Sequence, residues 1–330
     1  MNVRHTLLEL AARHHLSRPQ TQQLLQGAGL ADEPAALALW LPRGVAVLAA
    51  ALGGLGVVMW IAANWDTLGR LGHFALLQSL VLATGVGAAL APRARAPLGL
   101  LALLGIGALF AYFGQTYQTG ADPWQLFALW GALALPLCLG ARSDVLWAPW
   151  ALVVVTAISL WVHTYSGHRW SVQPDQLRVH VLAWSAMLVL VGALSRPWQG
   201  ITGAGIWGFR SAATLAVCAV TLTALGGLFF GTVKAQYPLG VLLLALGAGL
   251  LSTPRWFDIF ALSAVALGLN ALLVSGLVRW LGEGSWDNDW LGRLMLIGLF
   301  AAALLAASVS GILRLSRSTP TPNPNSGAPA

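Results

Sequence analysis

Charged side chains are scarce in this sequence: Asp, Glu, Lys and Arg make up 9% of the 330 residues, against roughly 25% in an average soluble chain. A water-soluble surface normally has about a quarter to a third of its positions charged. The composition therefore disfavours a soluble enzyme, a nucleic-acid-binding domain and a secreted disulfide scaffold. Apolar residues reach 57%, which predicts an all-α, polytopic integral membrane helix bundle.

Cysteine and lysine are nearly absent as well. Cys138 and Cys218 both lie in apolar runs and are interpreted as small hydrophobic residues rather than a disulfide pair. Lys234 is the one lysine among 18 basic residues. The arginines stand singly at the ends of apolar runs without forming a basic stripe, so no nucleic-acid partner is expected.

Long apolar runs are abundant. A helix needs about 20 mostly apolar residues to cross the hydrocarbon core, and this window predicts ten spans, with nine or eleven as alternatives. The first begins near Gly44, too late for a cleavable signal peptide. The predicted spans are 44–62, 72–91, 97–114, 123–140, 144–163, 177–194, 209–231, 237–252, 256–278 and 289–313.

The arginine distribution predicts the orientation. With the N-terminus in the cytoplasm, twelve basic residues fall in cytoplasmic segments and six in outer loops. Since Lys and Arg concentrate on the cytoplasmic side, both termini are predicted to be cytoplasmic. The chain is accordingly expected in the cytoplasmic (inner) membrane of a bacterium, with the lipid bilayer as its principal partner.

Both ends of the chain differ from the apolar middle, 44–313. Residues 1–43 are predicted to form a cytoplasmic helical hairpin, with helices over 3–15 and 19–27 and Ser17 as N-cap before the helix-opening Pro19. The proline- and asparagine-rich residues 314–330 predict a disordered cytoplasmic tail.

Polar residues concentrate in the predicted outer loops, where Trp and Tyr stand beside carboxylates and amides. Such side chains can stack on and hydrogen-bond a polar ligand, whereas an interfacial aromatic belt is the alternative explanation. The candidate ligand-binding residues are Asn64, Trp65, Asp66, Gln115, Tyr117, Gln118, Asp122 and Trp124.

Deep polar residues are few. Gln78 and Asn270 lie within predicted spans, and an interhelical hydrogen bond is favoured over a ligand contact for Asn270. No histidine reaches metal-ligand spacing with a carboxylate or cysteine. No catalytic motif, metal site or cofactor is predicted.

Two segments carry a resemblance to a known family. WIAANWDTLGRLGHFALL (60–77) and GALFAYFGQTYQTGADPWQLFALWGALALPL (107–137) are similar to a family of uncharacterised prokaryotic multi-pass proteins, domain of unknown function 2157. The similarity covers about residues 1–150 and implies a bacterial or archaeal membrane protein without supplying a mechanism. The matching positions are Trp60, Ile61, Ala62, Asn64, Trp65, Gly114, Gln115, Tyr117, Gly120, Leu126, Phe127 and Trp130.

Three functions remain open. The first is binding or transport of a small molecule or lipid through an outward-facing polar and aromatic mouth. The second is a structural or regulatory envelope protein whose residues 1–43 bind a cytosolic protein. An intramembrane transferase or hydrolase using Asp66, Asp122 and His163 ranks behind both, so an enzyme is not the favoured reading.

Overall fold

The computed structural model describes residues 3–28, 35–117, 120, 122–167, 171–282 and 290–318. These residues form helices and turns and contain no strand. The chain divides into two compact units, Met1–Trp60 and Ile61–Ala330. The all-α fold class predicted from composition is confirmed. The domain boundary expected near residue 43 stays a prediction.

The first unit begins with two short helices, α1 (Val3–Arg13) and α2 (Arg18–Gly27), which contact each other. Gln20 accepts a hydrogen bond from the backbone N–H of Ser17 at 2.9 Å, as in a capping box. Helix α3 (Ala35–Ala63) follows, with Pro42 inside it and a shorter apolar stretch over Gly44–Val57.

The second unit contains the remaining helices. Helix α4 is interrupted at Gly69, whose φ of 60° lies in the left-handed region that favours glycine. The bounds are α4 (Trp65–Leu90), α5 (Arg95–Tyr117), α6 (Pro123–Ala141), α7 (Asp144–Tyr165), η1 (Pro174–Gln176), α8 (Leu177–Ala193), η2 (Arg196–Trp198), α9 (Gln199–Thr202), α10 (Ile206–Phe229), α11 (Gln236–Leu251), α12 (Ile259–Gly282) and α13 (Trp290–Ser318).

Each of the ten predicted spans coincides with a helix. Eight helices in the described part of the chain are long and apolar enough to cross a membrane, which confirms a polytopic bundle. The stretches over 44–57 and 236–251 are shorter, so the number of ten stays a prediction. Helix α13 extends to Ser318, which makes the first residues of the expected tail helical, and residues 319–330 lie outside the described residues.

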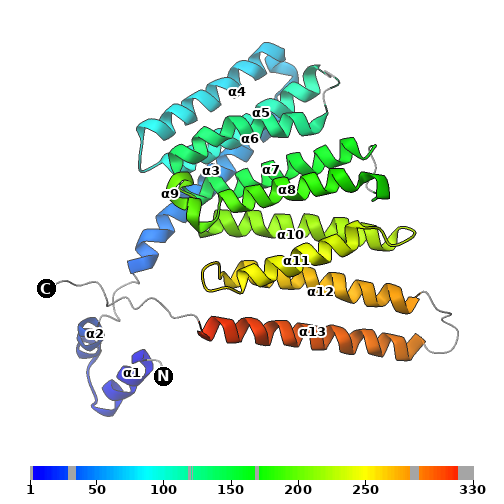
Figure 1. The fold of residues 1–330 in the computed structure, drawn as a ribbon. Coiled ribbons are helices and arrows are strands. Elements are labelled where there is room, and N and C mark those ends of the chain that lie inside the picture. The colour runs from blue at the N-terminus through cyan, green and yellow to red at the C-terminus, as the bar shows by residue number, and fades with distance from the viewer. Residues whose placement is uncertain are drawn as a thin grey trace. The chain divides into compact units, whose positions relative to one another are not determined.

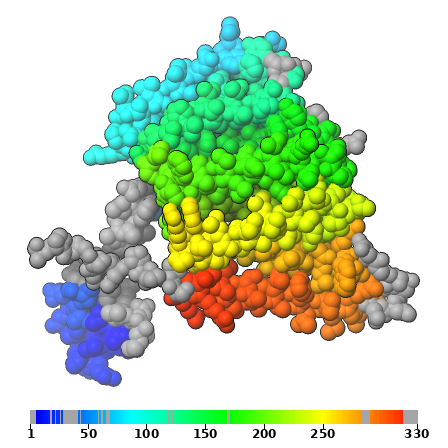
Figure 2. Space-filling model, viewed as in Figure 1, coloured from blue at the N-terminus to red at the C-terminus, as the bar shows by residue number. Residues whose placement is uncertain are grey.

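Successive long helices of the second unit run in opposite directions, so their connections gather at two ends (Figure 1). We call one the Arg142 end, which holds residues 91–94, 142–143, 194–205 and 252–258. The other is the Gln115 end, which holds residues 166–167, 171–176 and 230–235 and the C-terminus of α5. The chain progresses across the unit helix by helix, as Figure 2 shows.

Helix α10 is the central element of the second unit, because it packs against α7, α8, α11 and α12. One apolar core lies around Trp147, Leu103 and Ala212, and a second lies around Val220, Leu244 and Leu272. Helix α10 contributes residues to both cores. Its position therefore determines how the two halves of the unit pack.

The N-terminus of α10 is held by the carboxylate of Asp144, the first residue of α7. Asp144 accepts hydrogen bonds from the backbone N–H groups of Gly205 at 2.7 Å, Trp207 at 2.9 Å and Gly208 at 2.9 Å. A helix N-terminus leaves its first N–H groups without intrahelical partners and favours negative charge. A Cβ at Gly205 would collide with this carboxylate, so glycine is required there.

A second carboxylate ties α12 to α10. Asp258 accepts from the backbone N–H of Ala261 at 2.9 Å and pairs with the guanidinium of Arg210 at 3.0 Å. Two nitrogens of Arg210 reach the carboxylate, in the fork geometry that strengthens such pairs. The Arg142 end is therefore joined by charge-assisted contacts between helices.

Replacing Asp144 by Ala is expected to lower the free energy of unfolding by about 2 kcal/mol, since three N–H groups at the α10 N-terminus lose their charged acceptor. Thermal unfolding in detergent measures the effect, and Asp144→Asn should fall between wild type and Ala. Asp175→Asn, at an exposed carboxylate, is the matched control and should change stability little. Equal stability of Asp144→Ala and the control would contradict this assignment.

The predicted orientation is tested by single cysteines at exposed positions of the two ends, Gln115→Cys and Arg93→Cys. Both free cysteines, Cys138 and Cys218, are first replaced by alanine. A membrane-impermeant maleimide should label Gln115→Cys on intact cells and Arg93→Cys only after permeabilisation. The opposite pattern would show that the Gln115 end is cytoplasmic.

Candidate functional site

An aromatic cluster joins α4 to α5 at the Gln115 end. The ring of Phe74 lies 4.8 Å from that of Tyr112 and 5.8 Å from that of Tyr117. Phe113 packs on Tyr117 at 5.0 Å, and the Tyr112 hydroxyl lies 3.4 Å from Nδ1 of the buried His73. The end of α5 that carries Gln115 and Tyr117 is thereby fixed beside the beginning of α4.

The predicted ligand-binding residues fall into two groups. Gln115 and Tyr117 are exposed on the last turn of α5, beside α4, and Asn64 is the half-buried N-cap of α4. Asp122 is the N-cap of α6, and Trp124 follows in its first turn. The side chains of Trp65 and Asp66 and all of Gln118 lie outside the described residues.

Three of the residues that carry the family resemblance, Gly114, Leu126 and Trp130, pack α5 against α6. A Cβ at Gly114 would lie 2.9 Å from a methyl group of Leu126, and one at Gly107 would collide with the ring of Trp130. The indole N–H of Trp130 donates to the carbonyl of Leu103 at 2.8 Å. These positions therefore hold two helices in close contact, which is the role of small residues in membrane helix packing.

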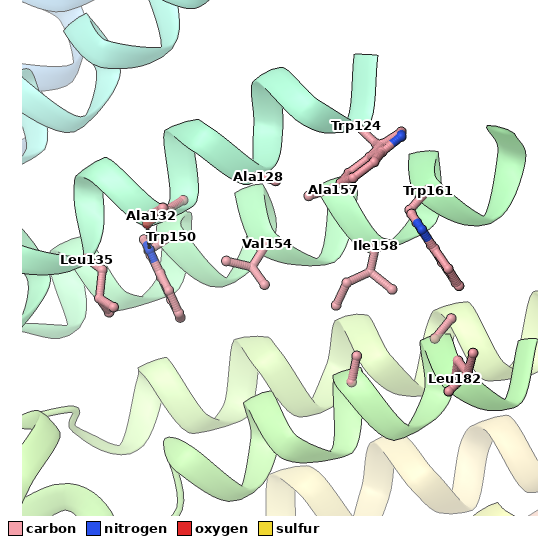
Figure 3. A pocket seen from close by; sticks show the side chains of 13 residues that line it. Trp124, Ala128, Ala132, Leu135, Trp150, Val154, Ala157, Ile158, Trp161 and Leu182 are labelled. Carbon is pink, nitrogen blue, oxygen red and sulfur yellow. Dashed lines mark hydrogen bonds between the residues drawn. The ribbon is translucent and has the colours of Figure 1, made fainter. Parts of the chain in front are cut away.

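An apolar groove of about 540 Å³ runs between α6, α7 and α8. Figure 3 shows Trp124 and Trp161 at one end of it and Leu135 and Trp150 at the other. The lining between the tryptophans consists of small and aliphatic side chains: Ala128, Gly131, Ala132, Val154, Ala157, Ile158, Leu182, Ala183 and Ala186.

The tryptophans of the groove differ in their hydrogen bonds. The indole N–H of Trp150 donates to the carbonyl of Gly131 at 2.8 Å, which fixes that ring against α6. The indole nitrogen of Trp124 is buried and has no hydrogen-bond partner in the part of the chain that the structure describes. A buried N–H without a partner is costly, so the indole of Trp124 is a donor that still needs a partner at the start of α6.

A smaller polar cavity of about 200 Å³ lies on the other side of the α7–α8 contact, where Ala183 lines both spaces. Several polar side chains of its lining donate hydrogen bonds to backbone carbonyls. Nδ1 of His180 donates to the carbonyl of Gln176 at 2.9 Å, and the hydroxyls of Ser159 and Thr223 donate to carbonyls of their own helices. Because these hydroxyl groups use their hydrogens in those bonds, their oxygens face the cavity as hydrogen-bond acceptors. The cavity therefore suits ordered water or a small uncharged molecule that donates hydrogen bonds. The polar residues lining it are Ser159, His163, Ser166, Ser171, His180 and Thr223.

Buried side chains hold the chain segment that covers this cavity. The amide of Gln176 donates to the carbonyl of Ser166 at 3.0 Å, and that of Gln236 to the carbonyl of Gln173 at 2.8 Å. The ammonium of Lys234, itself buried, donates to the carbonyl of Val172. The sole lysine of the chain thus satisfies a buried backbone group.

The two predicted intramembrane polar residues differ in environment. The Asn270 amide donates to the hydroxyl of Ser308 at 3.1 Å, which links α12 to α13. Gln78 is exposed on α4 and forms no hydrogen bond with a described residue. The described residues contain no group of three or more His, Cys, Asp or Glu that could hold a metal ion.

Sequence reasoning identified Trp124 but missed the rest of the groove. Trp161 lies in the last turn of α7, and its spacing from Trp124 along the chain gives no indication that the two line one space. Trp150 and the alanines lie in an apolar run without distinguishing polar neighbours. The one available signal was the pairing of a tryptophan at the start of α6 with one at the end of α7, since antiparallel neighbours bring those ends together.

Comparison with known proteins agrees with this architecture. A family model described as "Predicted membrane protein (DUF2157)" matches residues 8–147, from α1 to the first turn of α7. No curated protein and no solved structure matches the chain. The match includes all eight predicted ligand-binding residues and the packing of Gly107 and Gly114 against α6. Residues 8–147 are therefore similar to the DUF2157 family of predicted membrane proteins.

Proposed function

We propose that this membrane protein binds an amphiphile at its Gln115 end, with the apolar chain of the ligand in the groove between α6, α7 and α8. The observation that carries the proposal is the groove itself: about 540 Å³ of space with apolar walls and tryptophans at its ends. Ligand sites in proteins are mostly apolar and have a few convergent polar groups.

The shape of the lining favours a flexible alkyl chain. Alanines and a glycine form much of the wall, so the groove is open along α6, and its aliphatic residues provide only dispersion contacts. Trp124 and Trp161 lie at the Gln115 end, where α6 begins and α7 ends. Tryptophan favours the membrane–water interface, so this is the end at which a polar head group would lie.

The polar part of the ligand is assigned to the neighbourhood of Trp124. Its buried N–H has no partner among the described residues and would donate to a hydroxyl, ester or phosphate oxygen of the ligand. Asp122 stands two residues earlier. The exposed side chains of Gln115 and Tyr117 lie at the same end of the neighbouring helix, so they complete the polar mouth in this proposal, together with Asn64, Trp65, Asp66 and Gln118.

The two alternatives predict different requirements. A regulatory protein that acts through residues 1–43 would lose function when that segment is deleted and keep it when the groove is filled. For the enzyme alternative, His163 lines the polar cavity and not the groove, although α6 and α7 are packed neighbours. Amphiphile binding is favoured because it uses the groove and the Trp124 donor together.

Filling the groove is expected to abolish binding. Ala132 is exposed in the groove wall, so Ala132→Phe places a ring in the space without displacing core residues. Native mass spectrometry of the protein purified in mild detergent should show an amphiphile retained by wild type and lost from this variant. Leu133→Phe adds bulk at the next position, which is exposed outside the groove, and should retain the ligand.

Retention of the same species by Ala132→Phe would contradict the groove assignment, as would the absence of any retained species from wild type. A loss from both phenylalanine variants would indicate general lipid stripping. In each of these cases, residues 1–43 are deleted next, because only the regulatory alternative expects function to be lost with that segment.

Trp124→Phe keeps an aromatic ring but removes the N–H donor. The lost hydrogen bond, worth about 1 kcal/mol, should weaken ligand retention roughly fivefold. Trp161→Phe makes the same reduction in ring size on the opposite wall of the groove and is the matched control. A smaller loss of ligand retention is expected from it. The dissociation constant of the identified amphiphile, titrated into delipidated protein, measures both. Equal losses in the two variants would show that ring size matters and the N–H does not.

A further inference from the structure

A second apolar groove, at the Arg142 end, differs from the first in its charge. It measures about 330 Å³ and lies between α8, α10 and α11. Trp198 and Trp256 line it, together with aliphatic residues such as Leu188, Val191 and Leu251. It shares no lining residue with the groove between α6, α7 and α8.

A small polar recess adjoins this groove. Ser195, Phe209 and Trp256 line both spaces, and Arg196 and Gln199 complete the recess with Ile206 and Asp258. The apolar groove therefore opens beside a basic side chain and an amide. The apolar trough, the tryptophan and the polar recess follow one another in the order in which an acyl chain, a glycerol backbone and a head group follow one another in a phospholipid.

The recess carries a net positive charge. Asp258 is neutralised by Arg210, which it binds at 3.0 Å. Arg196 is exposed, and its guanidinium forms no ion pair or hydrogen bond with the described residues. Arg255, also exposed, stacks on the ring of Trp256 at 5.9 Å and likewise has no carboxylate partner in the described chain. Arg196 thus lines the recess without counter-charge, and Arg255 lies over a tryptophan that lines the groove.

We infer that this groove binds an anionic phospholipid. One acyl chain lies along α8, α10 and α11, and the phosphate lies between Arg196 and Arg255 at the level of Trp198 and Trp256. Arginine forms strong charge-assisted hydrogen bonds to phosphate oxygens. Basic pockets between membrane helices recognise anionic head groups, and zwitterionic phosphatidylcholine lacks the net charge that this pair selects.

The test compares two lipids with identical chains, dioleoyl phosphatidylglycerol and dioleoyl phosphatidylcholine. Each is titrated into the delipidated full-length protein, and the dissociation constant of the first bound lipid is measured by native mass spectrometry. Wild type should bind the anionic lipid more tightly. Arg196→Gln and Arg255→Gln should each weaken that binding roughly fivefold and leave phosphatidylcholine unaffected.

Matched controls separate this site from general surface charge. Arg93→Gln removes the same charge at the same end, from an exposed position outside the groove, and should leave both affinities unchanged. Gly192 lines the groove with open space where its side chain would be, so Gly192→Phe should weaken binding of both lipids. Gly249→Phe adds the same ring at an exposed position of α11 outside the groove and should have no effect.

Equal affinity of wild type for the two lipids would overturn the inference. The inference would also be overturned if Arg93→Gln lost its preference for phosphatidylglycerol over phosphatidylcholine to the same extent as Arg196→Gln. Ala132→Phe, which fills the groove at the Gln115 end, should leave phosphatidylglycerol affinity unchanged, so failure here is distinguishable from failure of the proposed amphiphile site.

Discussion

The carboxylate of Asp144 at the N-terminus of α10 is the contact on which the second unit depends. A helix N-terminus leaves its first N–H groups without intrahelical partners, and a carboxylate placed there satisfies them and complements the helix dipole. Asp144 accepts from three of these groups, and α10 in turn packs against α7, α8, α11 and α12. Asp258 plays the same part at the start of α12, where it accepts from the backbone N–H of Ala261 and pairs with Arg210 of α10. The two carboxylates Asp144 and Asp258 thus each accept backbone N–H groups at a helix N-terminus.

Away from these polar contacts, packing is decided by small residues beneath tryptophans. Gly107 lies under the ring of Trp130, and Gly208 lies against the Cβ of Trp147, so both contacts fit only because the glycine lacks a Cβ. Where small residues such as Ala128 and Ala132 follow one another along one face of α6, the same composition leaves a groove. The two grooves and the helix contacts therefore arise from one property of the sequence, its many small apolar residues.

Much of this organisation could be predicted from composition and run length. Every predicted span coincides with a helix, because apolar length is a strong signal and the connecting turns carry Pro, Gly or charge. The candidate site was predicted less well. Trp124 was found because it follows a polar loop, whereas Trp161, Ala183 and Arg196 became notable only through their neighbours. Some of the residues that carry the family resemblance, such as Gln115 and Tyr117, were candidates for ligand contact. Others, Gly114 and Trp130, pack α5 on α6.

The sequence by itself determined that the chain is a helical membrane protein, because 9% charged residues cannot cover a soluble surface and apolar runs of this length form spans. It also determined where each helix lies along the chain. Tertiary structure alone decided which helices are neighbours, which carboxylate holds which helix end, and where open grooves remain. Those outcomes depend on contacts between residues about 50 to 60 positions apart, such as Asp144 with Gly205 and Arg210 with Asp258, and run length or periodicity carries no information about such pairs.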